Sequence, residues 1–469
     1  MYQRILLSIC AGALAAGCTT VGPDYAGPPA MPLPEAFVRA NDAGTTAQAS
    51  AWWLGLNDSV LTGLVERAFA ANPGLAGTRS RLRQARAMLQ AERATQSPRG
   101  GAKALYAHAR MPSPGAGGED SPQLPSQLDL YNLGFDASWE IDLFGGQRRA
   151  VEAATASAQA AEADLADMQV SLAAEVVQVY VNLRSCQRRQ ALNEEAIARQ
   201  LRLLDLAGHR RAAGTATELD LARLQGQLES TRADSPPLVA ELDSYRNALA
   251  VLTGAPPGAL DTELARPAPV PLPPAAVAVR DPATLLRNRP DIRAAERALA
   301  ARTAQIGQAD AARLPRLNLM GLVGIGGTRL SDLTHLDDFV ALAAPQLSWN
   351  FLDFGRNASG LEKAQGRRDE AEARYRATVL AALRDTEDAL TRFRQRRVTV
   401  ATLARATEAA GRAADLTRAR QHGGTATTMD LLDAERARIN AEQRLASAEA
   451  ALTNDFVSLH KSLGLGWSR

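Results

Sequence analysis

The chain has 469 residues, of which 46% are hydrophobic but only 4% aromatic, and its 53 Lys and Arg nearly balance 51 Asp and Glu. The net charge of +2 gives no reason to expect nucleic acid as a partner. With so few large side chains, a compact globule of this length would be poorly filled. The composition therefore favours elongated helices packed through alanine.

Residues 1–17 have the pattern of a secretory signal peptide. Arg4 precedes an apolar run that ends in the small residues Ala15, Ala16 and Gly17, directly before Cys18. Small residues ahead of a cysteine are typical of a bacterial lipoprotein signal, so we predict a diacylglycerol and an N-linked acyl chain on Cys18. An ordinary signal peptide with an incidental cysteine is the alternative. No later stretch reaches about 18 apolar residues, so no transmembrane helix is predicted.

The segment after Cys18 contains three prolines by residue 29, and we expect an extended tether rather than a core element. A short amphipathic helix begins near Trp52 and ends at residues 72–73, which are Asn-Pro. A fresh helix is expected over residues 74–96. A twin of that helix opens at Arg-Pro and covers residues 289–313.

Each of these two helices leads into segments with a period of two. From Tyr131 to Leu143 every odd residue is apolar, whereas the even residues are Asn, Gly, Asp, Ser and Glu. This alternation predicts a strand with one apolar and one polar face. Residues 317–325 and 345–351 repeat the scheme, and residues 103–110 are the weakest of the four predicted strands. The loops between paired strands, about 111–127 and 327–338, are rich in turn-forming residues.

Strands of this kind fit either two soluble hairpins or an outer membrane, because the signal of each membrane strand is weak. The lipoprotein signal favours the membrane. Four strands cannot close a barrel, and lipid tolerates no open sheet edge. Several chains would then have to share one barrel.

The rest of the chain contains two copies of one pattern. Trp139-x-x-x-x-Phe144-Gly145 recurs as Trp349-x-x-x-x-Phe354-Gly355, and the Gly-Thr-Ala-Thr at 214–217 recurs at 424–427, both at an offset of 210 residues. Two repeated motifs at the same offset, without insertions or deletions between them, indicate an internal duplication. Between the landmarks lie about 65 proline-free residues with apolar positions three or four apart, which predicts a long coiled-coil helix. Gly suits a left-handed helix end and Thr suits a helix start, so each copy is expected to be a helical hairpin with a tight tip.

Three features distinguish the middle of the chain. Pro236-Pro237 predicts a break in the first return helix, because proline cannot donate a helix hydrogen bond. The proline-rich residues 254–282 are interpreted as a belt packed around the middle of the molecule rather than a free linker. Cys186 stands alone once Cys10 leaves with the signal, so no intrachain disulfide is possible and a buried apolar role is predicted.

Together these motifs resemble the TolC-like outer-membrane factors, in particular the NodT-type lipoprotein branch of resistance-nodulation-division (RND) efflux systems. The resemblance implies a homotrimer in which each chain gives four strands to a twelve-stranded barrel and two hairpins to a periplasmic tunnel. It also implies an exit duct in the outer membrane that works with a periplasmic adaptor (membrane fusion) protein and an inner-membrane RND-type transporter. The matching motifs are Cys18-x-x-x-Gly22-Pro23-Asp24-Tyr25, the Trp53–Leu64 helix, Arg289-Pro290-Asp291-Ile292-x-x-x-Glu296, Leu314-Pro315, Trp349–Gly355 and the two Gly-Thr-Ala-Thr tips.

The same resemblance assigns functional residues near the tips. The family's inner constriction falls on Asp430 and Asp433, with Met429 and Arg436 nearby, and the helix dipole favours carboxylates at a helix start. Arg223 stands opposite Asp433 in the first copy, which fits a first hairpin outside and a second hairpin lining the pore. Solvated helix-start carboxylates are the alternative. The expected adaptor contacts are Arg210, Gly214, Thr215, Ala216 and Thr217 with Arg420, Gly424, Thr425, Ala426 and Thr427.

The predicted fold class is α+β and mostly α, with long antiparallel coiled-coil hairpins, four membrane strands per chain and an internal two-fold repeat. The predicted parts are a signal peptide (1–17), an N-terminal tether and equatorial segment (18–71), a first repeat (72–253) with a strand pair at about 102–145 and a tip at 210–217, a Pro-rich equatorial connection (254–288), a second repeat (289–463) with a strand pair at about 315–355 and a tip at 420–427, and a tail (464–469).

The expected function is a passive exit duct for drugs or other small molecules, and a TolC-like duct for type I secretion or heavy-metal export is the alternative. An enzyme is a rival, but the five histidines have no metal-ligand spacing and no nucleophile or phosphate-loop motif appears. No cofactor or metal is predicted beyond the lipid on Cys18. A coiled-coil scaffold or an adaptor is the other rival, although an adaptor would carry one hairpin and no such strand pairs.

Overall fold

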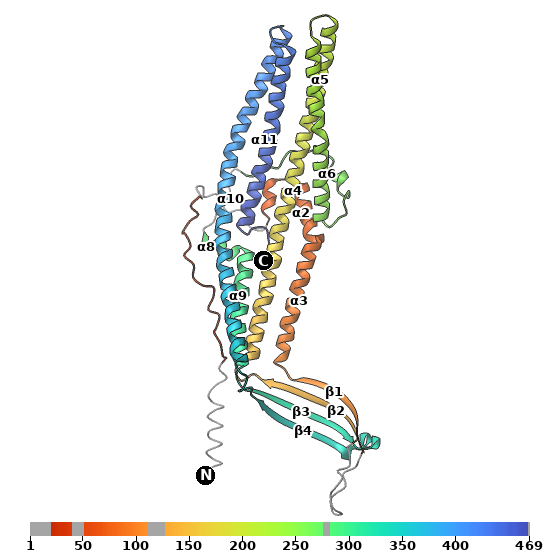
Figure 1. Ribbon diagram of the computed structural model, residues 1–469, viewed down its shortest axis with the longest axis vertical. Helices are drawn as coiled ribbons and strands as arrows, with labels where there is room; N and C mark the ends of the chain where they lie inside the picture. The colour runs from red at the N-terminus through yellow and green to blue at the C-terminus, as the bar shows by residue number, and fades with distance from the viewer. Residues whose placement is uncertain (1–19, 40–50, 111–126, 275–281, 468–469) are drawn as a thin grey trace, which may run out of the picture. The chain divides into compact units, whose positions relative to one another are not determined.

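The structure is a computed structural model and describes residues 20–39, 51–110, 127–274 and 282–467 (Figure 1). The predicted signal peptide and Cys18 lie outside the described residues. The chain forms two compact units. The first contains the N-terminal residues up to Pro29, Leu82–Ala160 and Ala295–Tyr375, and the second contains Ala30–Arg81, Ala161–Ala294 and Arg376–Arg469.

The first unit is built around a four-stranded antiparallel sheet with the order β1-β2-β3-β4 (Figure 1). The strands are β1 (Arg99–Arg110), β2 (Gln127–Ile141), β3 (Arg316–Gly327) and β4 (Phe339–Ser348). The four predicted strands are confirmed, and the pairing of β2 with β3 joins the two repeats in one sheet.

The end predicted for the last strand is wrong. We expected β4 to continue through Trp349 to Phe351, but it ends at Ser348. Ser348 pairs with Arg316, the first residue of β3. Arg316 follows Pro315, which has no backbone N–H to offer a further rung of the ladder.

One face of the sheet is apolar from Tyr131 to Ile141 of β2 and on the paired residues of the other strands. Phe135 lies opposite Val323 across the β2–β3 pair, and Trp139 is on the same face of β2. Near the other end of the sheet, Tyr106 and Tyr131 lie opposite each other with ring centroids 5.0 Å apart. An apolar face with aromatic residues towards both ends is typical of strands that cross an outer membrane.

The other face differs between the two hairpins. On the first hairpin, Lys103 Nζ lies 3.0 Å from Asp136 Oδ2. On the second hairpin, Leu322 and Leu342 face each other at the corresponding depth, since Leu322 also pairs with Asp136. The polar face expected from the sequence therefore belongs mainly to β1 and β2.

The two long helices have the same length. α4 (Gly146–Ala212) and α10 (Arg356–His422) each contain 67 residues, and their ends are separated by the same 210 residues as the sequence landmarks. Neither contains proline, and buried Ala, Val and Leu recur along each of them at helical spacing. The predicted long helices and the internal repeat are confirmed.

The return helices differ between the copies. In the first copy Asp234 separates α5 (Glu218–Ala233) from α6 (Ser235–Leu252), whereas in the second copy α11 (Thr428–Ser462) is continuous. Pro236 and Pro237 occupy the first turn of α6, where a missing N–H costs no helix hydrogen bond. The predicted break is confirmed.

Shorter elements complete the described chain. No helix among the described residues is both long and apolar enough to cross a bilayer. The remaining elements are η1 (Trp52–Leu56), α2 (Ser59–Ala71), α3 (Pro73–Thr95), α7 (Asp261–Leu264), α8 (Pro282–Asn288), α9 (Pro290–Ala311), and η2 (Leu330–Thr334) and η3 (Leu336–Asp338) in the loop between β3 and β4.

The proline-rich connection packs against the helices of the second unit. Gln187 Nε2 on α4 donates to Leu264 O at 2.7 Å, and Thr453 Oγ1 on α11 donates to Pro271 O at 2.8 Å. These bonds support the interpretation of this segment as a belt. Cys186 is fully buried, as predicted.

An aromatic core joins the N-terminal 3₁₀ helix to α11 in the second unit. The Trp52 ring lies 5.9 Å from the Phe456 ring and 5.2 Å from the His460 ring, centroid to centroid. Only 2% of His460 is exposed, and its Nδ1 is 2.9 Å from Phe456 O. Burial lowers the pKa of His460 to about 4, because the protonated ring would lose its hydration.

The residues after Cys18 are not a free tether. Their described part has no helix or strand, as predicted. From Thr20 to Tyr25, however, it packs against α4 and α9 through hydrogen bonds with Arg149 and Glu296. The sequence pattern gave the extended conformation but not the packing, because the contacting residues are more than 100 positions away.

Candidate functional site

Both hairpin tips are tight turns that depend on glycine. Gly214 and Gly424 have φ values of 76° and 74°, which L side chains rarely adopt. Directly after them, the Thr215 and Thr425 amides donate to the carbonyls at the helix ends, with N···O distances of 2.8 and 2.9 Å. The two tips lie at the same end of the second unit (Figure 1).

A capping box follows each tip. Thr427 Oγ1 accepts from the Asp430 amide at 3.1 Å, and Asp430 Oδ2 accepts from the Thr427 amide at 2.8 Å. These bonds from Thr427 hold the pKa of Asp430 below its ordinary value. Thr217 and Asp220 form the same box in the first copy. The Asp430 carboxylate therefore has a structural role that is common to both tips.

The other predicted constriction residues lie before and after Asp430 along α11. Asp433 and Arg436 are exposed three residues apart, and they do not share the bonds of the Asp430 box. Met429 is half-buried and packs on a cluster of Leu203, Ala207, Leu224, Leu431 and Leu432 that joins the two hairpins. Because the first copy has Arg223 in place of Asp433, Asp433 is the carboxylate that distinguishes the second tip.

The sequence analysis missed a buried carboxylate at the centre of this region. The Glu435 side chain is 9% exposed, and its two oxygens accept from Arg199 of α4, at 2.6 Å, and from Arg418 of α10. One residue of α11 thus connects three helices. The spacing of the apolar residues could have indicated its burial, because Glu435 lies in the apolar seam midway between Leu431 and Ile439.

Two further features surround this contact. Arg210 Nη1 of the first tip donates to Thr428 Oγ1 of the second tip at 2.9 Å. A cavity of about 110 Å³ lies between α4, α5 and α11, lined in part by Glu435, Asn193 and Gln200, and it is large enough for a few water molecules. The predicted contact residue Arg210 therefore also ties the two hairpins together.

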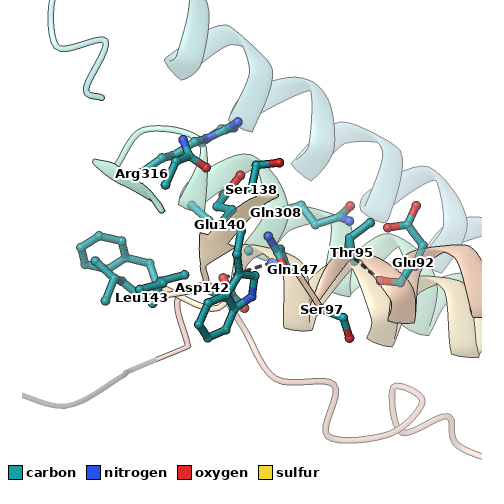
Figure 2. A pocket seen from close by; sticks show the side chains of 18 of the residues that line it. Glu92, Thr95, Ser97, Ser138, Glu140, Asp142, Leu143, Gln147, Gln308 and Arg316 are labelled. Carbon is teal, nitrogen blue, oxygen red and sulfur yellow. Dashed lines mark hydrogen bonds between the residues drawn. The ribbon is translucent and has the colours of Figure 1, made fainter. Parts of the chain in front are cut away.

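A polar chamber of about 450 Å³ lies in the first unit, where the strands lead into the helices (Figure 2). It is lined by the carboxylates of Glu92, Glu140 and Asp142 and by Arg99 and Arg316. Figure 2 shows Asp142 bonded to Gln147 at the start of α4, whose amide donates to Asp142 Oδ1 at 3.1 Å. The Arg148 amide donates to Asp142 Oδ2 at 2.9 Å. Within the described residues, no three His, Cys, Asp or Glu side chains are grouped to hold a metal ion.

Comparison with known proteins gives one consistent result. The family model described as outer membrane efflux protein matches residues 64–255 and 282–465. Nodulation protein T of Rhizobium leguminosarum bv. trifolii is 30% identical over 97% of this chain and 96% of its own length. Outer membrane protein OprJ of Pseudomonas aeruginosa is also 30% identical, over 97% of this chain and 94% of its own.

Solved structures extend the similarity to the fold. The outer-membrane channel OprN is 35% identical with a TM-score of 0.88, covering 95% of this chain and 99% of that one. The open state of the MtrE outer membrane channel of Neisseria gonorrhoeae is 27% identical with a TM-score of 0.82, covering 96% and 99%. The expected family, the mostly helical α+β fold and the outer-membrane location are confirmed.

Proposed function

This chain belongs to the outer membrane efflux protein family and forms an exit channel of the outer membrane, and we propose that three copies form one passive duct that joins a periplasmic adaptor and an inner-membrane RND-type transporter. The unpaired edges of the four-stranded sheet are the observation that supports a trimer. β1 pairs only with β2, and β4 pairs only with β3, among the described strands. In lipid these edges need partners, which β1 and β4 of neighbouring copies would supply.

We infer that the gate of the duct lies at the second tip. Asp433 is exposed there, with Arg436 one turn away and Met429 at the hairpin interface. Three copies would bring Asp430 and Asp433 around one axis as six carboxylates, a ring that favours cations over anions. Asp430 also caps its helix, so the larger part of the gating effect is assigned to Asp433.

Glu435 is the proposed latch of this gate. Its bonds to Arg199 and Arg418 hold α11 against α4 and α10. Withdrawing α11 from the axis would leave a buried carboxylate without its cationic partners, which is costly. Binding of the pump partners would have to offset that cost.

The exposed tips are the proposed contacts for the adaptor. Each tip presents an arginine, Arg210 or Arg420, beside a glycine turn with open space around it. The contacts comprise Arg210, Gly214, Thr215, Ala216 and Thr217 with Arg420, Gly424, Thr425, Ala426 and Thr427. The arginine and the Gly-Thr-Ala-Thr of the tips are the same in the two copies, which favours one type of partner helix at both.

Two further assignments complete the proposal. Cys18 carries the lipid anchor, on the strength of the small residues before it. The cargo consists of small molecules supplied by the transporter. Relatives include a pyoverdine export protein and toluene efflux proteins of Pseudomonas, and a duct in type I secretion or heavy-metal export is the second candidate. We assign the chain no catalytic step.

Purification tests the assembly. In detergent we expect a heat-resistant particle with the mass of three chains by multi-angle light scattering. The particle should co-purify with the adaptor encoded near it, and tips changed to Arg210→Glu and Arg420→Glu should lose that adaptor but keep the trimer. A monomer that never enters micelles would contradict the proposal.

A further inference from the structure

The first described residues, Thr20 to Tyr25, begin at the turn between β2 and α4 and continue along α4 and α9 in the first unit. We call them the N-terminal strap. The Val21 amide donates to Phe144 O at 3.0 Å, in the turn between β2 and α4. Thr20 lies against Gly145, where an added Cβ would come within 2.9 Å of the Thr20 Cα. The strap therefore fits the turn at the level of the backbone.

Arg149 of α4 binds the strap at three points. Its Nε donates to Val21 O at 3.1 Å, and its Nη2 donates to Gly22 O at 3.0 Å and to Asp24 Oδ1 at 2.7 Å. Its remaining Nη1 donates to Glu152 at 2.7 Å, and only 4% of the Arg149 side chain is exposed. Burying a guanidinium is costly unless its donors find partners, and most of these partners belong to the strap.

Two glycines let the strap approach α9 closely. Gly22 has a φ of +83°, and a Cβ there would lie 2.4 Å from the Gly307 Cα. A Cβ on Gly307 would lie 2.8 Å from Val21 O. Any side chain at either position would push the strap away from α9.

The end of the strap is held by a separate set of contacts. Tyr25 packs on a cluster of small residues, Ala156, Ala300 and Ala301, that joins α4 to α9. Its hydroxyl donates to Glu296 Oε1 at 3.2 Å. The surface that binds the strap therefore extends along both α4 and α9, and we call it the seat.

The second copy shows that the turn does not need a strap. Gly355 has the same left-handed backbone as Gly145, with a φ of +86°, yet nothing lies within 4 Å of a Cβ added there. Ser359 stands where the first copy has Arg149, and Phe354 is 88% exposed. Arg149 is therefore an addition that serves the N-terminal segment rather than the turn.

We propose that this seat fixes the position of the lipid-bearing N-terminus and that Arg149 is its positioning residue, an inference that rests on the proposed acylation of Cys18. Cys18 is two residues from Thr20 in the sequence, and two residues span at most about 7 Å. The acyl chains then enter the membrane beside the end of β2, near Trp139 on the apolar face. With a free tether, the acyl chains would have no fixed position around the channel.

The seat is tested by hydrogen exchange on the intact trimer in detergent. Arg149→Met and Gly22→Ala should each speed exchange of the Val21 amide at least tenfold. Gly27→Ala is the matched control, because Gly27 also has a positive φ, +110°, but open space around it. It should change the exchange rate less than twofold. Unchanged exchange in Arg149→Met and Gly22→Ala would overturn the seat.

The position of the lipid is tested separately, in cells fed palmitate that carries a photoreactive diazirine. In the wild type, crosslinks from the acyl chain should concentrate near the end of β2, and Arg149→Met should reduce that fraction at least fivefold while labelling persists. The same crosslink distribution in both proteins would overturn the positioning role. No label on the wild type would refute acylation itself, and a protected Val21 amide would show that the seat exists without it.

Discussion

The two copies of the repeat have long helices of equal length at a constant offset, yet they differ at three levels. At the base, the first turn is covered by the N-terminal strap, whereas Phe354 of the second turn is 88% exposed. In the return arm, the first helix is broken at Asp234 and the second is continuous. Just past the tip, Arg223 corresponds to Asp433.

These differences show how a duplicated frame acquires separate tasks. Residues that build the frame, such as the tip glycines and the threonine caps, are the same in both copies. Arg149, Glu435 and Asp433, which we propose to anchor, latch and gate, occur in only one. Glu435 corresponds to Gln225 and His460 corresponds to Ala250. Each difference between the copies can therefore be tested with its counterpart as the control.

The largest effect is expected at Glu435. Replacing it by alanine removes one acceptor from Arg199 and one from Arg418, although these keep Glu195 and Asp415. Two lost hydrogen bonds between charged groups cost about 3 kcal/mol. Hydrogen exchange of the first turns of α11 should rise by roughly a hundredfold, since 1.4 kcal/mol corresponds to a factor of ten. Gln225→Ala in the first copy should change exchange little. Equal effects at the two positions would mean that Glu435 is no latch.

Acid should open the end of the second return helix but not the first. Burial lowers the pKa of His460 to about 4 from an ordinary 6.5. The folded state therefore favours the neutral ring, and stability present above pH 6.5 is lost as the pH falls towards 4, by roughly 3 kcal/mol.

Exchange of the amides around His460, measured from pH 7 to pH 4 after correction for intrinsic rates, should show this loss. Amides around the buried Ala250 provide the reference within the same molecule. The variant His460→Gln should flatten the pH dependence. A dependence that survives in the variant would assign the titration to another group.

The smallest effect is expected at the shared caps. Thr217→Ala and Thr427→Ala each remove one capping hydroxyl, and local opening of the following helix should rise roughly fivefold in both copies. The two changes should match, because the two boxes have the same bonds. A much larger effect at Thr427 would indicate that the second cap belongs to the gate as well as to the frame.

Sequence alone predicted what local chemistry decides. The two 67-residue helices, the glycine tips, the break at Pro236-Pro237 and the four alternating strands each follow from residues within one element. The role of Glu435 was not predicted because its partners lie on two other helices. The packing of the strap was not predicted because Gly22 contacts Gly307 only in the folded chain, and no pattern in either segment indicates that contact.

Single-channel recording in planar bilayers tests the central claim most directly. The purified trimer should form cation-selective channels of low conductance. The double variant Asp430→Ala and Asp433→Ala should raise that conductance, on the order of twofold or more, by removing the charged ring. Arg223→Ala, at the matching position of the first copy, should leave it unchanged. A protein that conducts no ions, or a double variant with the conductance of the wild type, would contradict a duct gated at its second tip.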